Sequence, residues 1–196
     1  MRTSIISAAA MTCMLSAPAL AQTKPPADTP LHEAVGAPDN LKLSGTFRIR
    51  IEGIDNQFRP APIAESDACL SMRTTLFAEY DAHPVKIGAE LFDSRGYVEK
   101  KTSSVGTTEI NAFELGQAYI GADLGNALGK GTTSSLTVGR FTMDIGSRRL
   151  VARNQFRNTI NSFTGVRFDW QDAGKDTLRL FWTMPQYRLP DQTAQI

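Results

Sequence analysis

Residues 41–52 alternate an apolar or small side chain with a polar or charged one over the length of a strand. Successive side chains of a β-strand point to opposite faces of the sheet, so the pattern predicts one apolar and one polar face. The apolar face holds Leu41, Leu43, Gly45, Phe47, Ile49 and Ile51, and the polar face holds Lys42, Ser44, Thr46, Arg48, Arg50 and Glu52. In a soluble sandwich the polar face meets bulk water, whereas in an outer-membrane barrel it lines a water-filled lumen. A transmembrane strand takes about 9–11 residues, which favours the barrel.

Similar alternation, interrupted by turn residues, predicts further strands and no helix. The expected ranges are 69–80, 85–91, 112–122, 136–143, 163–170 and 177–184. His83-Pro84 falls in a short connection that is typical of an antiparallel hairpin. Phe92-Asp93 reverses the phase of the third strand, which indicates a bulge or the end of the span. Residues 94–109 are polar and are expected to form a long external loop.

These strands predict an all-β fold, an antiparallel transmembrane β-barrel within residues 41–196. The expected number of strands is about seven, whereas bacterial single-chain barrels usually have an even number. The sequence closes on a polar run, residues 191–196, and not on a strand with a terminal aromatic residue. We therefore expect an incomplete barrel, the N-terminal portion of a larger one.

The first 21 residues predict a cleavable signal peptide. Arg2 gives a positive start, residues 5–15 are apolar, and Ala19-Leu20-Ala21 is a small-x-small cleavage site. The apolar stretch is too short for a spanning helix, and the context of Cys13 does not suit a lipoprotein site. Residues 22–40 are rich in proline and polar residues, so we expect a flexible lead-in. The expected location is the bacterial outer membrane.

Charge and composition exclude some functions. Without Arg2, the mature segment holds 20 basic and 20 acidic residues, so nucleic acid is not an expected partner. Cys69 is its only cysteine, so no disulfide forms within one chain. The hydrophobic content of 41% suits a globular domain and a barrel equally well.

Enzymatic chemistry lacks a candidate site. His32 lies in the lead-in and His83 in a turn, so neither has a position suited to a general base. We find no Gly-x-Ser-x-Gly, phosphate loop or metal-ligand cluster, and Cys69 in a strand is expected to pack rather than react. Carboxylates such as Glu79 and Asp81 are expected to face the lumen. We predict no enzyme activity and no cofactor.

Arginine is the better candidate for function. Several arginines fall on polar strand faces, and others cluster in one connecting segment; they are Arg48, Arg50, Arg73, Arg167 and Arg179 in strands and Arg148, Arg149, Arg153 and Arg157 in the segment. Guanidinium groups stay charged and bind carboxylates in bidentate fashion, so they could draw anions into a pore. Alternatively, they neutralise neighbouring acids and hold the lumen together.

Several blocks resemble the alginate export family of outer-membrane barrels. They are Phe113 to Tyr119, Val138-Gly139-Arg140, Asp144 to Val151 and Asn158 to Arg167, with weaker likeness at Leu43 to Arg50 and Ala89 to Tyr97. The resemblance implies a monomeric barrel of about eighteen strands, whose arginine-rich constriction passes an anionic uronate polymer out of the cell. It implies lumen contacts with carboxylate groups at Arg140, Arg148, Arg149 and Arg167, with Arg48 and Arg73 as weaker candidates. Phe163-Thr164-Gly165 departs from the Phe-Asp-Gly that is common in the family.

The leading hypothesis is a passive outer-membrane channel for anionic polysaccharide or small anions. Its expected partners are outer-membrane lipid, the solute, and the barrel-assembly and periplasmic export machinery. Two alternatives remain: a non-conducting barrel that anchors the envelope or binds a partner, and a soluble periplasmic sugar-binding β-sandwich.

Overall fold

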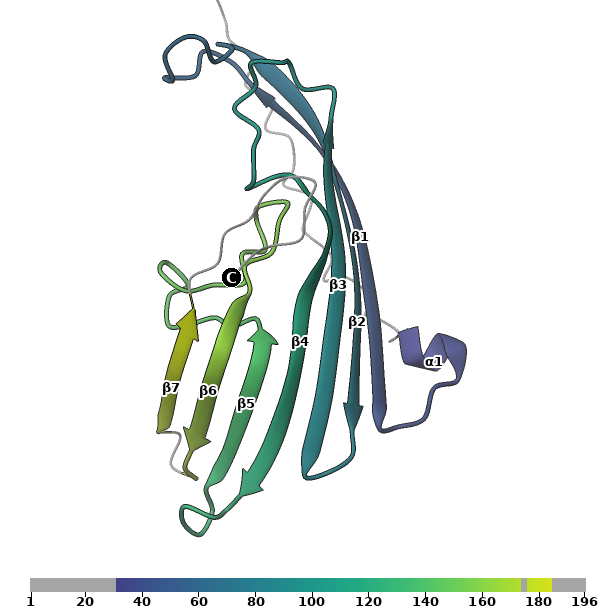
Figure 1. Cartoon of the computed structure of the whole chain (residues 1–196), viewed down its shortest axis with the longest axis vertical. Helices are drawn as coiled ribbons and strands as arrows, with labels where there is room; N and C mark the ends of the chain where they lie inside the picture. The colour runs from purple at the N-terminus through teal and green to yellow at the C-terminus, as the bar shows by residue number, and fades with distance from the viewer. Residues whose placement is uncertain (1–30, 174–175, 185–196) are drawn as a thin grey trace, which may run out of the picture.

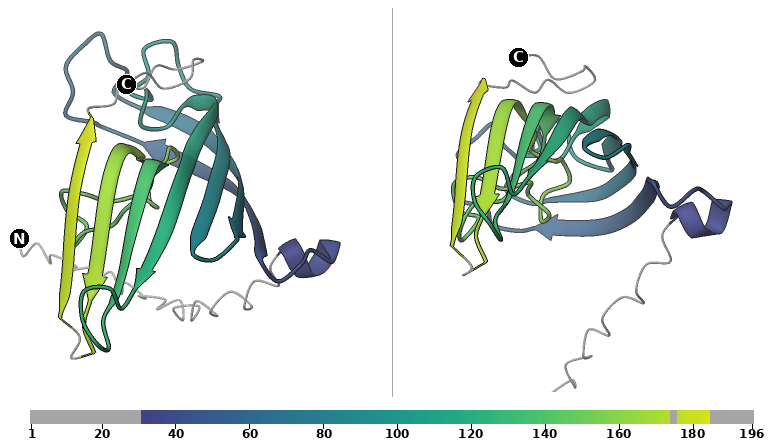
Figure 2. Two further views of the ribbon diagram at one scale, coloured as in Figure 1. Left: turned by 60° about the horizontal axis from the view of Figure 1, so that its bottom comes forward. Right: turned by 90° about the horizontal axis from the view of Figure 1, so that it is seen from below.

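The computed structural model describes residues 31–173 and 176–184 (Figure 1). The predicted signal peptide and residues 22–30 of the lead-in lie outside the described residues. Within the described residues, seven strands pair in chain order into one antiparallel sheet. They are β1 (Leu41–Ile54), β2 (Asp67–Asp81), β3 (Val85–Tyr97), β4 (Asn111–Gly125), β5 (Thr133–Phe141), β6 (Phe163–Gln171) and β7 (Thr177–Met184). The sheet curves around a concave face, and β1 and β7 form its edges (Figure 2). The expected fold class, an all-β antiparallel sheet of an incomplete barrel, is confirmed.

A short helix, α1 (Leu31–Val35), precedes β1 within the lead-in and was not predicted. Five residues are too few to show helical periodicity in the sequence, so the pattern carried no signal for it. Within the described ranges, no helix is long and apolar enough to cross a membrane.

The phase reversal at Phe92-Asp93 marks a bulge, and the prediction that residues 94–97 belong to a loop is wrong. β3 continues to Tyr97, while the pairing with β4 shifts between Glu90 and Leu91 and again between Phe92 and Ser94. The Phe113 N–H turns out of the ladder and donates to Asp93 Oδ1 at 2.9 Å, and Phe113 has φ +43°. The irregularity in β4 changes the direction of side chains at the bulge, while β3 itself continues.

The burial pattern is the reverse of that in a soluble sheet. One row of paired residues crosses all the strands with apolar side chains on the outer face: Leu41, Tyr80, Ile87, Ile120, Val138, Val166 and Trp182. Most of these side chains are exposed. The buried residues of the strands are mainly polar, among them Ser71, Arg73, Thr75, Glu90, Ser94, Asn111, Glu114, Gln117 and Thr137. An apolar exterior and a polar interior are the arrangement that lipid on one side and water on the other require.

In the adjacent row, on the inner face, the ring of Tyr119 packs across Gly88. Gly88 pairs with Tyr119 on β4 and with Glu79 on β2. A Cβ atom at Gly88 would overlap the Tyr119 ring. Because Gly88 has no side chain, the ring crosses β3 and its hydroxyl donates to Glu79 Oε2 at 2.5 Å. Lys42 of β1 pairs with the other Glu79 oxygen at 2.9 Å, so this contact joins four strands.

A charge on the outer face should destabilise the protein because it would enter lipid. We expect Ile120→Arg to lower the free energy of unfolding by up to about 2–4 kcal/mol, the cost of arginine on a lipid-facing site near the bilayer midplane. Leu128→Arg is the control, since Leu128 is also exposed but lies in the β4–β5 turn. The measurement is a urea titration of protein folded in lipid vesicles, followed by the heat-modifiable band. Equal midpoints for the two variants would contradict a lipid-facing Ile120.

The packing of Tyr119 on Gly88 predicts a specific double-mutant result. Gly88→Ala should destabilise by about 1–3 kcal/mol through overpacking. Adding Tyr119→Ala should recover part of that loss because the clashing ring is gone. Gly53→Ala in β1, where a Cβ has open space, is the matched control in the same urea titration. Strictly additive effects of the two substitutions would show that the ring does not lie over Gly88.

Candidate functional site

The segment of residues 142–162 between β5 and β6 folds against the concave face of the sheet, and we call it the inner loop (Figures 1 and 2). It reaches as far as the opposite edge strand, since Arg48 of β1 donates to its backbone. Ser162, at its end, donates through Oγ to the Gly116 carbonyl of β4. The inner loop therefore lies over the polar side of the sheet and contacts strands far from it in the sequence.

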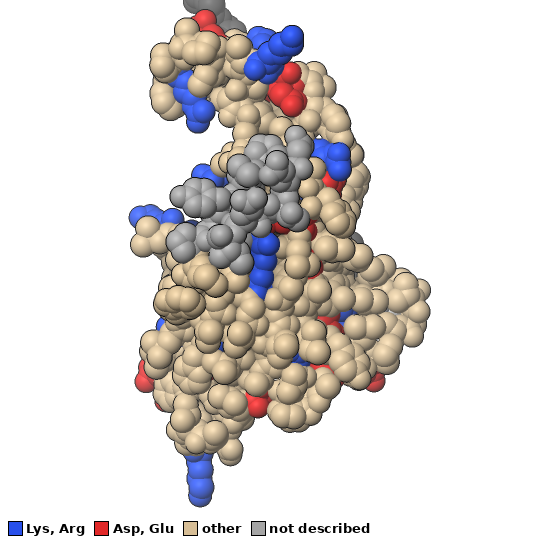
Figure 3. Space-filling view, viewed as in Figure 1, with Lys and Arg blue, Asp and Glu red and all other residues tan. Residues whose placement is uncertain are grey.

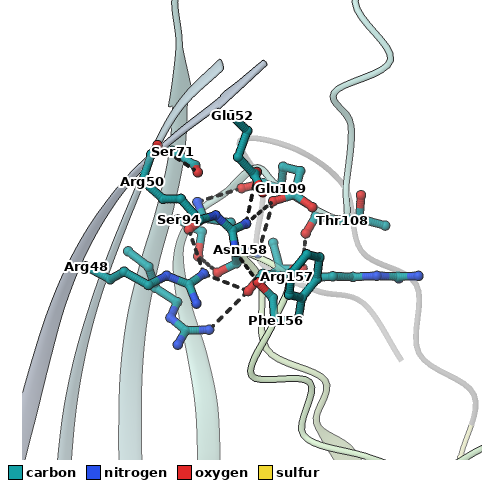
Figure 4. Close-up of polar contacts among 12 residues, drawn as sticks. Arg48, Arg50, Glu52, Ser71, Ser94, Thr108, Glu109, Phe156, Arg157 and Asn158 are labelled. Atoms are coloured by element: carbon teal, nitrogen blue, oxygen red, sulfur yellow. Dashed lines mark hydrogen bonds and ion pairs between the residues drawn. The ribbon is translucent and has the colours of Figure 1, made fainter. Parts of the chain in front are cut away.

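Asn158 is the central attachment of the inner loop (Figure 4). Its side-chain Nδ2 lies within hydrogen-bond distance of three carbonyl oxygens, those of Met72 at 3.0 Å, Arg95 at 3.2 Å and Glu109 at 2.9 Å. Its carbonyl accepts the Ser94 hydroxyl at 2.7 Å. Asn158 is fully buried. One amide thus ties the inner loop to β2, β3 and the β3–β4 loop, and leaves no buried donor on Nδ2 without a partner.

Three arginines of the sheet wall hold the backbone just before Asn158. Arg48 donates to the carbonyls of residues 155 and 157, both at 2.8 Å. Arg73 also donates to the carbonyl of residue 157, at 3.3 Å, and Arg50 donates to that of residue 156. The fork of a guanidinium group suits such multiple acceptors.

A buried ion pair fixes the middle of the inner loop. Glu90 of β3 is 3% exposed, and Arg153 approaches both of its oxygens, with Nη1 2.7 Å from Oε2. Gln117 of β4 donates to Glu90 Oε2 at 2.6 Å and accepts the Thr142 N–H at 3.1 Å. The carboxylate is therefore buried with a charged partner and a further hydrogen bond, as a buried charge requires.

A small apolar group lies on the same inner side. Phe92, Phe141, Met143 and Ile160 are buried, and the Arg167 guanidinium lies 5.1 Å from the Phe141 ring centroid. Met143 and Ile160 stand near the two ends of the inner loop. Apolar burial thus adds to the polar attachments where the inner loop leaves and rejoins the sheet.

The structure places four of the predicted arginines in contacts within the protein. Arg48 and Arg73 bind inner-loop carbonyls. Arg140 pairs with the buried Glu114 of β4, and Arg167 pairs with Asp169 at 2.7 Å. The pairs of Arg140 and Arg167 match the interpretation in which arginines neutralise neighbouring acids, whereas Arg48 and Arg73 bind neutral carbonyl groups.

The other two predicted arginines project from the inner loop. Arg148 is 66% exposed, with Asp144 3.4 Å away, and Arg149 is exposed. Arg157 shares this exposure; the sequence placed it in the same arginine cluster, but not among the lumen contacts that the resemblance implies. The six predicted residues therefore do not form one ring: Arg48 and Arg73 meet beneath the inner loop, while Arg148 and Arg149 stand out from it. Their contact with a solute stays a prediction.

A hollow of about 760 Å³ lies beside the start of the inner loop, lined mainly by β4 to β7 and also by one residue each of β2 and β3. Its lining is charged but mixed in sign: Lys86, Arg167 and Arg179 against Glu79, Asp123, Asp144 and Asp169. Asp169 lies between Arg167 and Arg179 and pairs with both. Figure 3 likewise shows basic and acidic side chains interspersed on the visible face. Within the described ranges, no cluster of three metal-binding side chains occurs.

Sequence reasoning did not single out Asn158 or Glu109. Glu109 accepts the Asn158 N–H at 3.1 Å and lies 3.5 Å from Arg50. Both residues sit in connections where no periodic pattern exists. Asn158 begins one of the sequence blocks that resemble the alginate export family, and this resemblance is the one signal in the sequence that points to it.

A curved antiparallel sheet with an apolar outer face and a polar, loop-covered inner face defines the class of outer-membrane β-barrel proteins. The family model described as Alginate export matches residues 39–195, so the chain belongs to the alginate export family. This is a family of outer-membrane transport proteins and not of enzymes. Comparison with curated proteins and with solved structures found no match. The resemblance seen in the sequence is thus confirmed.

Removing the Asn158 amide should release the inner loop. We expect Asn158→Ala to speed hydrogen exchange across residues 142–162 about tenfold or more, because the lost hydrogen bonds leave buried carbonyls unsatisfied at about 1–3 kcal/mol. The measurement is hydrogen exchange with mass spectrometry on the folded protein. Asn126→Ala, at an exposed turn position, is the control and should change nothing there. Unchanged protection of the inner loop in Asn158→Ala would refute its role.

Proposed function

We propose that the protein is a passive outer-membrane channel for anionic polysaccharide or small anionic solutes, and that its inner loop selects the solute. The proposal rests on the position of the inner loop, which lies on the polar side of a sheet whose other side is apolar. This segment holds four arginines, and Asp144 is its one acidic residue. With Arg153 paired to Glu90, Arg149 and Arg157 are left as exposed cations, and Arg148 is exposed with Asp144 beside it.

Exposed guanidinium groups in a lumen favour anions for a simple reason. They stay protonated at any physiological pH, and they bind carboxylates through two parallel hydrogen bonds. A narrow aqueous space between low-dielectric walls strengthens their field. Arg148, Arg149 and Arg157 are then the first contacts of an entering anion, with Arg140, Arg167, Arg48 and Arg73 behind them in the wall.

Delivery to the outer membrane belongs to the same proposal. The signal peptide of residues 1–21 directs export across the inner membrane. The barrel-assembly machinery then inserts the strands, and the exposed apolar row meets outer-membrane lipid. The soluble sandwich is not proposed further, because the described residues form a single sheet with an exposed apolar face.

A non-conducting barrel is the second candidate, and a specific observation favours it. Arg48, Arg50 and Arg73 all hold the inner loop against the wall. A segment attached this firmly across the concave face could block the lumen. Conductance separates the two candidates.

Neutralising the exposed arginines should remove anion preference. In planar bilayers, we expect the complete protein to be anion-selective, and Arg148→Ala with Arg149→Ala to shift the reversal potential in a salt gradient toward the non-selective value. Arg59→Ala, an exposed arginine of the β1–β2 loop, is the control and should leave it unchanged. A cation-selective channel that the double substitution does not alter would contradict the anion role. Folded protein without any conductance would favour the non-conducting barrel.

A further inference from the structure

We propose that Gln155, Phe156 and Arg157 form a subsite for one carboxylated sugar unit, with the Phe156 ring against the face of the pyranose and Arg157 on its carboxylate. This inference rests on the proposed channel function and deepens it. It adds recognition of the sugar ring to recognition of charge, so it separates a polysaccharide from a small inorganic anion.

The first step of the argument is the backbone of these residues. Their three consecutive carbonyl oxygens all accept hydrogen bonds from wall arginines: residue 155 from Arg48, residue 156 from Arg50, and residue 157 from both Arg48 and Arg73. The buried Asn158 follows directly. The backbone of this tripeptide is therefore fixed against the sheet without belonging to any strand or helix.

The second step is the direction of the side chains. Gln155, Phe156 and Arg157 are all exposed, and Figure 4 shows Arg157 extending away from the wall strands. Phe156 is 77% exposed. Because the inner loop lies on the polar side of the sheet, lipid does not account for this exposed ring. The ring is thus presented to the aqueous side of the sheet by a backbone that the wall arginines fix.

The third step is the ring itself. The Arg50 guanidinium lies 5.1 Å from the Phe156 ring centroid, within the range of a cation–π contact. Arg50 is in turn held by Glu52 at 3.0 Å and Glu109 at 3.5 Å. With 77% of the residue exposed, the guanidinium covers at most one face of the ring. The contact with Arg50 favours one orientation of the ring and leaves the other face for a solute, which lowers the entropy cost of binding.

The chemistry of the three side chains together fits a sugar acid. One face of a pyranose ring presents C–H groups that pack on an aromatic face, and its hydroxyl groups exchange hydrogen bonds with a carboxamide such as that of Gln155. Its carboxylate accepts the fork of Arg157. A chloride or phosphate ion has no apolar face that could pack on the ring, so Phe156 is the residue that distinguishes the two classes of solute.

The test is calorimetric binding to the complete folded protein in detergent micelles, which does not depend on conductance. The probes are a tetramer of a uronic acid, a neutral glucose tetramer and acetate. We expect Phe156→Ala to weaken binding of the uronate tetramer about tenfold, a loss that corresponds to about 1.4 kcal/mol, and Phe156→Tyr to retain it. Arg157→Gln should weaken the uronate tetramer but not the neutral one. Phe58→Ala is the matched control, since Phe58 is 95% exposed in the β1–β2 loop and outside the subsite.

The outcomes separate this inference from the channel proposal. Hydrogen exchange of the inner loop must match the unsubstituted protein, which shows that Phe156→Ala leaves the loop in place. Unchanged uronate affinity in both Phe156→Ala and Arg157→Gln would overturn the subsite and leave the channel proposal intact. Failure of the unsubstituted protein to bind the uronate tetramer would overturn the subsite and the polysaccharide part of the function, while anion selectivity in bilayers could still stand.

Discussion

The requirement that every backbone polar group in lipid finds a partner governs this protein. Hydrocarbon offers no water, and each unpaired N–H or C=O costs several kcal/mol there. Antiparallel pairing meets this requirement for β2 to β6, which have neighbours on both sides. Once the backbone is committed to such a ladder, side chains alternate between lipid and the inner side. Polar residues then fill the interior, and their side chains find partners partly across the sheet, as Tyr119 does with Glu79, and partly on other segments of the chain.

The inner loop supplies many of these additional partners. A soluble domain of this size would gather its elements around an apolar core, whereas the apolar group here is small, centred on Phe141 and Ile160. Directional contacts hold the inner loop instead, chiefly those of Asn158 and of the Glu90–Arg153 pair. Hydrogen bonds and ion pairs specify distance and angle as well as proximity, and in a partly dry interior they reinforce one another. A segment without regular secondary structure thereby acquires one geometry.

The sequence predicted the sheet well because alternation is a local signal with a fixed period. It failed at the end of β3, since the irregularity of β4 near Phe113 depends on how two strands meet and not on either alone. The contacts inside the sheet were much harder to predict from the sequence. Arg48 was correctly placed on the polar face, but its acceptors lie 107 and 109 positions further along the chain. Asn158 reaches Met72 across 86 positions. Such partners follow from the path of the inner loop, which no periodicity encodes.

The hydrogen-bond acceptors of Arg48 and Arg73 determine how much positive charge remains at the wall. Both bind oxygens of peptide groups, and Arg48 also lies 3.3 Å from the amide oxygen of Asn158. These neutral acceptors bind the Nη donors but cancel none of the guanidinium charge, unlike the carboxylate that neutralises Arg140. The wall behind the inner loop therefore keeps the positive charge of these two arginines, and the Nε atom of each is buried without a hydrogen-bond partner among the described residues. A carboxylate that displaced these carbonyls would exchange one set of acceptors for another and gain the charge attraction as well, so the wall holds the inner loop with bonds that an anion is able to replace.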